Sequence, residues 1–221
     1  MKSGWLKIVI LISLAMIGFA CGDDDFNDAG LVDFRLDLVT FKSFSQGEAV
    51  FENVNRTGDI TTLVANGVDD PGLAKDHRVL MRYREKDGGQ YSRQIEIYSI
   101  TKIISDSLRV NKLPMTEYDL HELRLQSIWQ TGEFINVRCQ VEYTGKLRSF
   151  FLLMDGDTRD NEVVDCYLVH DLKGEEPLHW RDCYASFNIG YLMKRPTCKR
   201  IRVFLTDVVR PETECYIFEK E

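Results

Sequence analysis

The sequence predicts an all-β protein in which a small barrel is followed by a seven-stranded β-sandwich. Three observations support this prediction: short segments of alternating polarity, turn residues between them, and no long apolar pattern with a 3.6-residue period. Hydrophobic residues make up 44% of the 221 residues and charged residues 29%, which is typical of a folded globular chain. At roughly 100–200 residues per domain, this length allows one domain or two small ones.

The N-terminal segment 1–20 has the pattern of a secretion signal. Lys2 and Lys7 give it a positive start, and the apolar run 8–20 is too short for a membrane-spanning helix, which needs about 20 residues. We therefore expect segment 1–20 to be cleaved on export. The mature chain then starts at Cys21, and the loss of Lys2 and Lys7 changes its formal net charge from −7 to −9.

The residues before Cys21 resemble the processing site of a bacterial lipoprotein. Gly18, Phe19 and Ala20 precede the cysteine, although Gly18 and Phe19 depart from the common pattern of an aliphatic residue followed by a small one. The Cys21 thiol is the group that takes the lipid, so we expect the membrane to be a partner through an N-terminal lipid anchor. The alternative is a signal cut elsewhere, with Cys21 an ordinary thiol.

An acidic tether is predicted over residues 21–31. Asp23, Asp24 and Asp25 stand together, and like charges so close repel one another and favour an extended, solvated spacer. The tether also resembles the acidic export signal that anaerobic Gram-negative bacteria place after the lipidated cysteine of surface lipoproteins. We therefore expect an outer-membrane lipoprotein exposed on the cell surface. The alternative is a plain spacer that faces the periplasm.

The region 32–105 is predicted to form the barrel. A turn-rich loop over 66–72 and a candidate hairpin turn over 87–90 separate its later strands. Five strands without a long helix, in about 75 residues, are typical of an OB-type barrel. The five strand candidates are 34–41, 49–53, 60–64, 78–84 and 94–104.

The region 106–119 contains Pro114 and mixed polarity, and we interpret it as a linker. The region 120–221 then carries strand candidates about every dozen residues, separated by glycine-containing turns, which is the pattern of a β-sandwich. The seven candidates are 123–129, 134–143, 147–154, 163–169, 183–192, 201–208 and 215–218.

Three segments and the order of the elements resemble the NigD-like lipoproteins. The segments are 65–67 before an acidic loop, 77–83 with the sequence HRVLMRY, and 128–137 with the sequence IWQTGEFINV. The resemblance covers the chain from about residue 32 to its end and implies an OB domain, a β-sandwich and an envelope location. It implies no established activity. The family takes its name from a member in a bacteriocin locus, which suggests immunity or resistance as a role.

Five cysteines remain after Cys21, and this odd number leaves at least one free thiol even in an oxidising compartment. Cys139, Cys166 and Cys183 alternate with apolar residues and are predicted to be small core residues. Cys198 and Cys215 flank the last predicted hairpin and, with a turn near residue 210, lie too far apart to be bridged. At least one disulfide among the five stays an alternative.

No catalytic or metal-binding motif stands out, and no cofactor is expected. The four histidines lack a zinc-binding spacing, and there is no nucleophile elbow, phosphate loop or dinucleotide fingerprint. The acidic loop 154–162 has the oxygen atoms for Ca²⁺ but not the EF-hand order, so we interpret it as a solvated turn. We expect a non-enzymatic protein. A β-sandwich hydrolase with scattered carboxylates such as Asp165, Asp182 and Glu142 is an alternative without a defined site.

Four basic residues alternate along one predicted barrel strand and form a candidate anion-binding stripe: Arg78, Arg82, Arg84 and Lys86. The alternative is a solvated strand face that discourages edge pairing. Nucleic acid is not expected as a partner, because the chain is acidic and the alternation puts Tyr83 on the opposite face, away from the basic residues. Trp129 and Trp180 are candidates for stacking on sugar rings, although Trp129 also suits a core position.

Ser107 is a candidate O-glycosylation site, because Asp106-Ser107-Leu108 matches an Asp-Ser/Thr-aliphatic acceptor pattern used in the same bacterial group. From the sequence alone, the leading interpretation is a lipid-anchored envelope protein that binds an extracellular protein, peptide or glycan. Bacteriocin immunity and an unidentified hydrolase activity are its alternatives.

Overall fold

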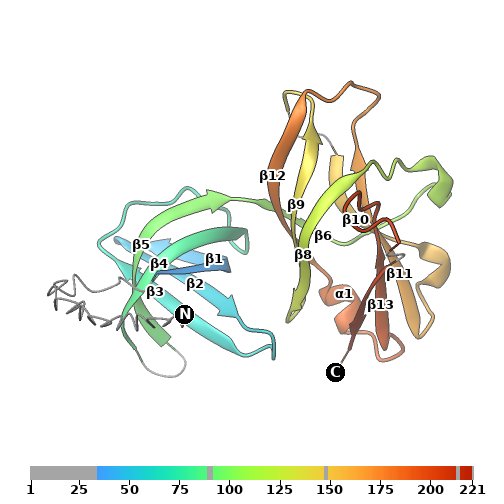
Figure 1. The fold of residues 1–221 in the computed structure, drawn as a ribbon. Helices are drawn as coiled ribbons and strands as arrows, with labels where there is room; N and C mark the ends of the chain where they lie inside the picture. Colours follow the sequence, from blue (N-terminus) through green and yellow to red (C-terminus); the bar gives the residue numbers. More distant parts are fainter. Residues whose placement is uncertain (1–33, 89–91, 147–148, 213–214, 221) are drawn as a thin grey trace, which may run out of the picture. The chain divides into compact units, whose positions relative to one another are not determined.

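The computed structural model describes residues 34–88, 92–146, 149–212 and 215–220, so Cys21, Asp23, Asp24 and Asp25 lie outside the described residues. The segment Asp33–Glu221 forms one compact unit. Its regular secondary structure is almost entirely strand, arranged as a barrel followed by two further sheets (Figure 1), which confirms the predicted all-β class. Within the described residues, no helix has both the length and the apolar character that a membrane span requires.

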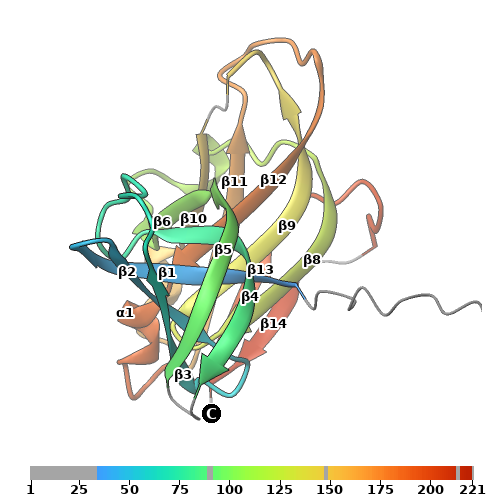
Figure 2. The same cartoon turned by 90° about the vertical axis from the view of Figure 1, so that its left-hand side faces the viewer.

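The N-terminal part of this unit is a closed five-stranded barrel in the order β1-β2-β3-β5-β4. The β3 and β5 strands pair in parallel, and the other neighbours pair antiparallel, as β4 and β5 do side by side in Figure 2. This arrangement confirms the OB-type barrel. Its strands are β1 (Arg35–Ser45), β2 (Glu48–Val54), β3 (Ile60–Asn66), β4 (Arg78–Gly88) and β5 (Ser92–Lys102).

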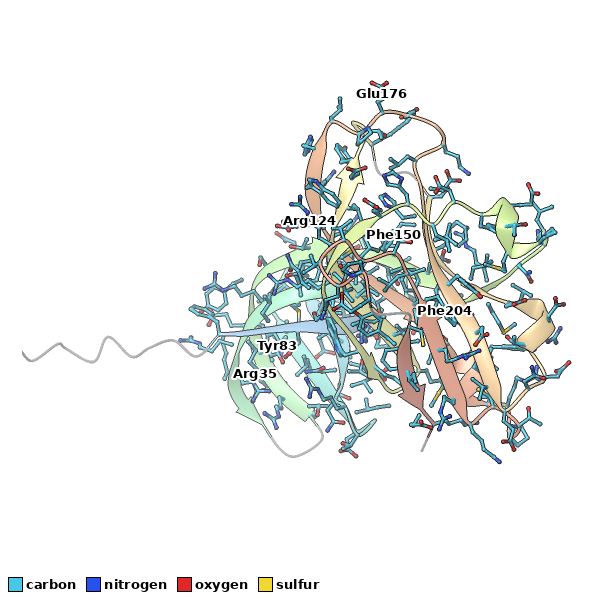
Figure 3. The ribbon with its side chains drawn as sticks, turned by 45° about the vertical axis from the view of Figure 1, so that its right-hand side comes forward. Arg35, Tyr83, Arg124, Phe150, Glu176 and Phe204 are labelled. Atoms are coloured by element: carbon cyan, nitrogen blue, oxygen red, sulfur yellow. The ribbon has the colours of Figure 1, made fainter. Side chains whose placement is uncertain are left out.

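Alternate residues on each strand fill the barrel, as period-2 patterning requires. Tyr83, labelled in Figure 3, is fully buried there, and its hydroxyl donates a hydrogen bond of 2.8 Å to Asp37 Oδ2. Burial, together with the Asp37 charge, raises the pKa of the Tyr83 hydroxyl. Leu38 and Thr40 on β1 are buried as well, although they alternate with the barrel-core residues Val39 and Phe41. Their outward face is therefore covered by another part of the compact unit.

The C-terminal part contains two further sheets. One has the order β14-β13-β11-β10-β7 and the other the order β6-β12-β9-β8. The seven strands that the sequence predicts are present as β8 (Leu123–Thr131), β9 (Phe134–Tyr143), β10 (Ser149–Met154), β11 (Val163–Asp171), β12 (His179–Asn188), β13 (Arg200–Phe204) and β14 (Tyr216–Glu219). Short turns of helix are η1 (Met115–Glu117), η2 (Gly156–Thr158) and α1 (Gly190–Met193).

Two more strands come from the segment that follows the barrel. The β6 strand (Ile104–Ser107) pairs in parallel with β12, and β7 (Arg109–Val110) pairs in parallel with β10. The described sheets of the sandwich therefore hold nine strands rather than seven, and part of the expected linker 106–119 belongs to them. These strands are too short to show alternation, and their partners lie far away in the sequence, so local patterning did not predict them.

Both sheets contribute to one hydrophobic core. Phe150, labelled in Figure 3, lies in it with its ring centroid 6.1 Å from that of Phe187. Cys139, Cys166 and Cys183 are buried in the same core, which confirms their predicted positions, and Cys198 joins them. The five described cysteines are all free thiols.

Candidate ligand site between the barrel and the sandwich

Arg78 begins β4 and is only 1% exposed. Its guanidinium donates hydrogen bonds from Nε to Ser186 Oγ at 3.0 Å, from Nη1 to Thr40 Oγ1 at 3.2 Å and from Nη2 to Asn136 Oδ1 at 3.3 Å. The guanidinium carbon also lies 4.3 Å from the centroid of the Phe134 ring. One side chain thus joins β1 and β4 of the barrel to β9 and β12 of the sandwich.

All of these partners of Arg78 are electrically neutral. Among the described residues, Arg78 forms no ion pair with a carboxylate, and burial lowers its pKa to about 10. Moving a charge out of water costs free energy, and an opposite charge normally offsets part of that cost. A buried cation without a counter-charge therefore indicates a candidate site for an anionic ligand nearby.

Two of the polar partners of Arg78, Asn136 and Ser186, stand on the outer face of the four-stranded sheet. Asn136 and Ser186 lie directly opposite each other on β9 and β12 and alternate with core residues of the sandwich. The Ser186 hydroxyl donates to Asn136 Oδ1 at 2.8 Å, and Asn136 Nδ2 donates to Thr131 Oγ1 at 2.9 Å. Asn136 and Ser186 are fully buried. This network holds the acceptors in place for Arg78.

A cavity of about 250 Å³, here called the junction pocket, opens beside this network. Arg138 lines it and is exposed, with its guanidinium carbon 5.5 Å from the Tyr184 ring centroid. No ion pair of Arg138 is found within the described part of the chain. The lining residues are Leu36, Asp37, Leu38, Asn53, Val54, Arg78, Leu80, Ser127, Trp129, Thr131, Arg138 and Tyr184.

The junction pocket combines positive charge with apolar and aromatic surface. Arg78 and Arg138 are two cations, and Asp37 is the one carboxylate among the lining residues. Asp37 is already bound by the Tyr83 hydroxyl and by Asn53 Nδ2, at 2.8 Å and 3.2 Å. Trp129 and Tyr184 add half-buried rings. The arrangement suits a ligand that has an anionic group and an apolar or ring-shaped body.

The candidate stripe on β4 does not form one exposed anion site. Arg78 is buried at the junction, which corrects the expectation that it lies on a solvated face. Arg84 pairs with Glu96 at 2.7 Å, and Lys86 lies 4.0 Å from the same carboxylate. Arg82 sits over the Phe34 ring, 4.4 Å from its centroid. Alternation places a side chain on one face of its own sheet, but it does not show which part of that face is covered.

Ser107 is exposed at the end of β6, with its backbone N–H bound to Asp106 Oδ1 at 2.8 Å. Trp180 carries Arg124 over its ring at 4.2 Å from the centroid, on the outer face of the four-stranded sheet. Trp129 lines the junction pocket instead of filling the core. Of the candidate residues named from the sequence, the structure brings Arg78 and Trp129 together in one cavity.

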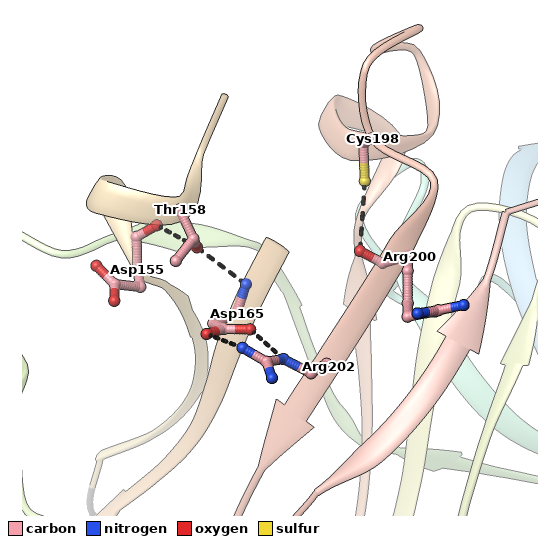
Figure 4. Close-up of polar contacts among 6 residues, drawn as sticks. All are labelled: Asp155, Thr158, Asp165, Cys198, Arg200 and Arg202. Carbon is pink, nitrogen blue, oxygen red and sulfur yellow. Dashed lines mark hydrogen bonds and ion pairs between the residues drawn. The ribbon is translucent and has the colours of Figure 1, made fainter. Parts of the chain in front are cut away.

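The carboxylates considered for a hydrolase have separate partners. Asp165 forms two hydrogen bonds of 2.6 Å with Arg202 (Figure 4), Asp182 accepts one of 3.1 Å from Gln140, and Glu142 lies 2.5 Å from His121 Nε2.

The acidic loop caps its own turn η2. Asp155 accepts a hydrogen bond of 3.0 Å from the backbone N–H of Asp157. The Thr158 hydroxyl donates one of 3.0 Å to the Asp155 carbonyl, and Figure 4 shows this second bond. In the part of the chain that the structure describes, no three metal-ligating side chains gather at one place.

Comparison with solved structures identifies the fold. A protein of unknown function, DUF1344, from Bacteroides vulgatus superposes with a TM-score of 0.67 at 17% identity, covering 86% of this chain and 92% of that one. A NigD-like immunity protein from Bacteroides caccae gives 0.56 at 18% identity, over 83% and 91% of the two chains. The chain has the NigD-like fold. This confirms the resemblance seen in the sequence at the level of the fold.

A candidate lipoprotein from Bacteroides fragilis shares this NigD-like fold, with a TM-score of 0.60 at 11% identity over 86% of this chain and 99% of that one. No protein-family model and no curated protein matches the sequence. The three structural relatives just described are named as a protein of unknown function, an immunity protein and a candidate lipoprotein, and none of them is named as an enzyme.

Sequence reasoning missed Asn136, Arg138, Tyr184 and Ser186 as site residues. All four stand at outward positions of β9 and β12, where polar residues are ordinary. Alternation assigns Asn136 and Ser186 to a solvent-facing side of the sheet. Both are in fact fully buried, because the barrel covers that side, so local patterning held no signal for them.

Proposed function

We propose that this protein is a lipid-anchored envelope protein that binds an extracellular ligand without chemically changing it. The lipid anchor is assigned to Cys21 and the acidic tether to Asp23, Asp24 and Asp25, which place the folded unit on the cell surface. A candidate lipoprotein and a NigD-like immunity protein with the same fold support an envelope role.

The observation that carries the binding role is the junction pocket. It has two arginines without a carboxylate partner among the described residues, next to two aromatic side chains. We assign the anionic group of the ligand to Arg138 and the Arg78 end of the pocket, and its apolar body to Trp129 and Tyr184. A carboxylated glycan or a peptide with a free carboxylate has both features.

Binding can be tested with matched ligand pairs that differ only in charge. A uronic-acid oligosaccharide is compared with its neutral hexose counterpart, and a peptide carboxylate with its amide, by isothermal titration calorimetry. A charge-assisted hydrogen bond contributes ~1.5–3 kcal/mol, so the charged member should bind at least about tenfold more tightly. Equal affinity of both members, or no binding by any of them, contradicts this ligand class.

Arg138→Gln should remove the preference for the charged ligand. Arg124→Gln is the matched control, because Arg124, labelled in Figure 3, is also an exposed arginine on the four-stranded sheet but does not line the junction pocket. If both variants lose affinity equally, the effect comes from the overall charge of the sheet and not from the pocket.

Anchoring and orientation have a separate test. Intact cells that express the wild-type chain or Cys21→Ala are treated with a protease, and the protein is followed in membrane and soluble fractions. We expect the wild type in the membrane fraction and digested from outside, and Cys21→Ala released from the membrane. A membrane-bound wild type that resists the protease until the outer membrane is opened contradicts surface exposure and favours the periplasmic orientation.

Bacteriocin immunity is a second candidate function, favoured by the NigD-like immunity protein among the structural relatives. On this alternative the ligand is a protein toxin from a sibling strain. Deletion of the gene should increase killing by such strains, and re-expression should reverse the increase. Unchanged sensitivity to a panel of sibling strains counts against immunity and leaves the small-ligand role standing.

A further inference from the structure

Two cysteines face each other inside the sandwich. Cys139 on β9 and Cys183 on β12 are direct partners in the antiparallel register, and they are 1% and 7% exposed. Both point into the hydrophobic core, where Val137, Val141 and Ala185 are their neighbours along the strands. In the registers of the described strands, Cys166 lies opposite Met154 and Val203 instead.

The geometry of this pair suits a covalent bond. Directly opposed residues in an antiparallel sheet have Cα atoms about 4.5–5.5 Å apart, which lies within the range of about 4.4–6.8 Å found for disulfides. The neighbouring Cys183 side chain raises the pKa of the Cys139 thiol most, and burial in the core raises it further. Cys139 therefore keeps its proton.

The two thiols differ in their access to solvent. Cys183 lines a surface cavity of about 330 Å³ together with Lys102, Arg181 and Tyr184, whereas Cys139 does not line it. A reagent that enters this cavity therefore meets Cys183 first, with Cys139 directly behind it.

We propose that Cys139 and Cys183 form an oxidisable pair that closes to a cross-strand disulfide by exchange with an oxidised dithiol or glutathione disulfide. The Cys183 thiolate attacks one sulfur of glutathione disulfide, which forms a mixed disulfide and releases one glutathione thiolate. Cys139 then loses its proton and attacks the Cys183 sulfur, which breaks the mixed disulfide and releases the second glutathione. Two protein thiols are oxidised, and one glutathione disulfide is reduced to two glutathione molecules.

The test is a peptide map of the full chain carrying Cys21→Ala, incubated with glutathione disulfide, alkylated and digested with trypsin without reduction. Trypsin places each of the five cysteines on its own peptide, with Cys139 on 139–146 and Cys183 on 182–194. We expect these two peptides to be linked and the other three cysteines to be alkylated. Alkylation of both Cys139 and Cys183, or a link to another cysteine, overturns the proposal.

Single variants test the order of the two steps. Cys139→Ala should stop at a stable mixed disulfide between glutathione and Cys183, and Cys183→Ala should leave Cys139 alkylated. Cys166→Ala is the control and should leave the 139–183 link unchanged. If a variant does not fold, a limiting amount of a methylthiolating reagent on the unmutated pair gives the same information, because Cys183 should be modified before Cys139. Modification of Cys139 first contradicts the assigned access.

Oxidation in the cell rests on the proposed export of the chain, and a second measurement keeps the two questions apart. Cells are quenched with acid and alkylated, and the exported chain is compared with a version that lacks residues 1–20. The exported chain should be linked and the retained version should carry thiols. If the purified chain forms the Cys139–Cys183 disulfide but both cellular forms carry free thiols, the result contradicts delivery of the chain to an oxidising compartment. If the purified chain does not form this disulfide, the result contradicts the proposed pair.

Discussion

Arg78 Nη2 donates a hydrogen bond of 3.3 Å to Asn136 Oδ1, and this contact joins the first residue of β4 to the third residue of β9, 58 positions further along the chain. Three neutral oxygens accept from the same guanidinium. The interaction holds barrel strands to sandwich strands and sets one end of the junction pocket.

Arg78→Ala should therefore destabilise the protein by roughly 3 kcal/mol, because it leaves buried acceptors without a donor and opens a cavity, while removal of a desolvated charge offsets part of the loss. Arg78→Lys should also lose stability, since an ammonium group cannot make the same fork of contacts. Urea unfolding measures both. Arg56→Ala, at an exposed turn, is the control and should change stability by no more than about 0.5 kcal/mol. A similar small change for Arg78→Ala would contradict the role of the network.

Gly132 lies close to the barrel at the junction, because a Cβ atom there would be 2.9 Å from Val54 Cγ1 on β2. Its φ of +51° also strains any other residue. Gly145 is the matched control: its φ is +92°, and a Cβ atom there meets nothing within 4 Å. We expect Gly145→Ala to cost about 1 kcal/mol and Gly132→Ala ~1–3 kcal/mol more, through overpacking against the barrel.

A double-mutant cycle with Val54→Ala isolates the clash. In that background, Gly132→Ala should cost no more than Gly145→Ala, because the methyl group that it meets is gone. An unchanged extra cost in the Val54→Ala background means that the loss comes from the loop itself and not from contact between β2 and the turn.

Much of the fold follows from local patterning. The five barrel strands and seven of the sandwich strands were predictable, because alternation such as Ile135, Val137, Cys139 and Val141 reports burial of one sheet face directly. The β6 and β7 strands were not, since four residues and two residues carry no period and their parallel partners are distant in sequence.

The candidate site was far less predictable than the fold. Arg78 has the same even spacing as Arg82 and Lys86, yet the first is buried and the other two are exposed. The difference arises because only the start of β4 is covered by β9 and β12, and that contact depends on residues more than fifty positions away. Local alternation contains no information about such a contact.

The ion pair between Asp165 and Arg202 should contribute to stability. Its two parallel hydrogen bonds of 2.6 Å (Figure 4) hold β11 to β13, and the bond to Asp165 raises the pKa of Arg202. Asp165 is 8% exposed, but the Arg202 side chain is 41% exposed, so solvent screens part of the interaction. We expect Asp165→Asn to cost ~1–2 kcal/mol in urea unfolding.

The Arg200–Glu219 pair provides a control for the Asp165–Arg202 pair, because it lies on the same strand β13 and its partners are 45% and 60% exposed. Glu219→Gln should cost less than about 0.5 kcal/mol, as exposed ion pairs do. Equal losses for Asp165→Asn and Glu219→Gln would mean that burial of Asp165 adds nothing to this interaction.

His170 should make stability depend on pH. It is fully buried, its Nδ1 lies 3.3 Å from the Glu122 carbonyl oxygen, and its Nε2 has no hydrogen-bond partner among the described residues. Burial lowers the pKa of His170 most. The hydrogen bond with the Glu122 backbone and the charges of Asp119 and Glu142 oppose this effect, and nearby His121 adds to it. The folded state therefore binds this proton less readily than the unfolded state does.

The sign of the effect follows from proton linkage. Below the ordinary histidine pKa of about 6.5, His170 is protonated in the unfolded chain but stays neutral in the folded one. The contribution of His170 to the free energy of unfolding is therefore fully present above about pH 6.5 and decreases as the pH falls below that value. His170→Phe suits a site that already contacts Phe150, at 5.8 Å between ring centroids, and should flatten this slope. His179→Phe, at an exposed position of β12, should keep the wild-type slope. Urea unfolding at several values from pH 5 to 7.5 measures all three proteins, and equal slopes for the wild type and His170→Phe would assign the pH dependence to other groups.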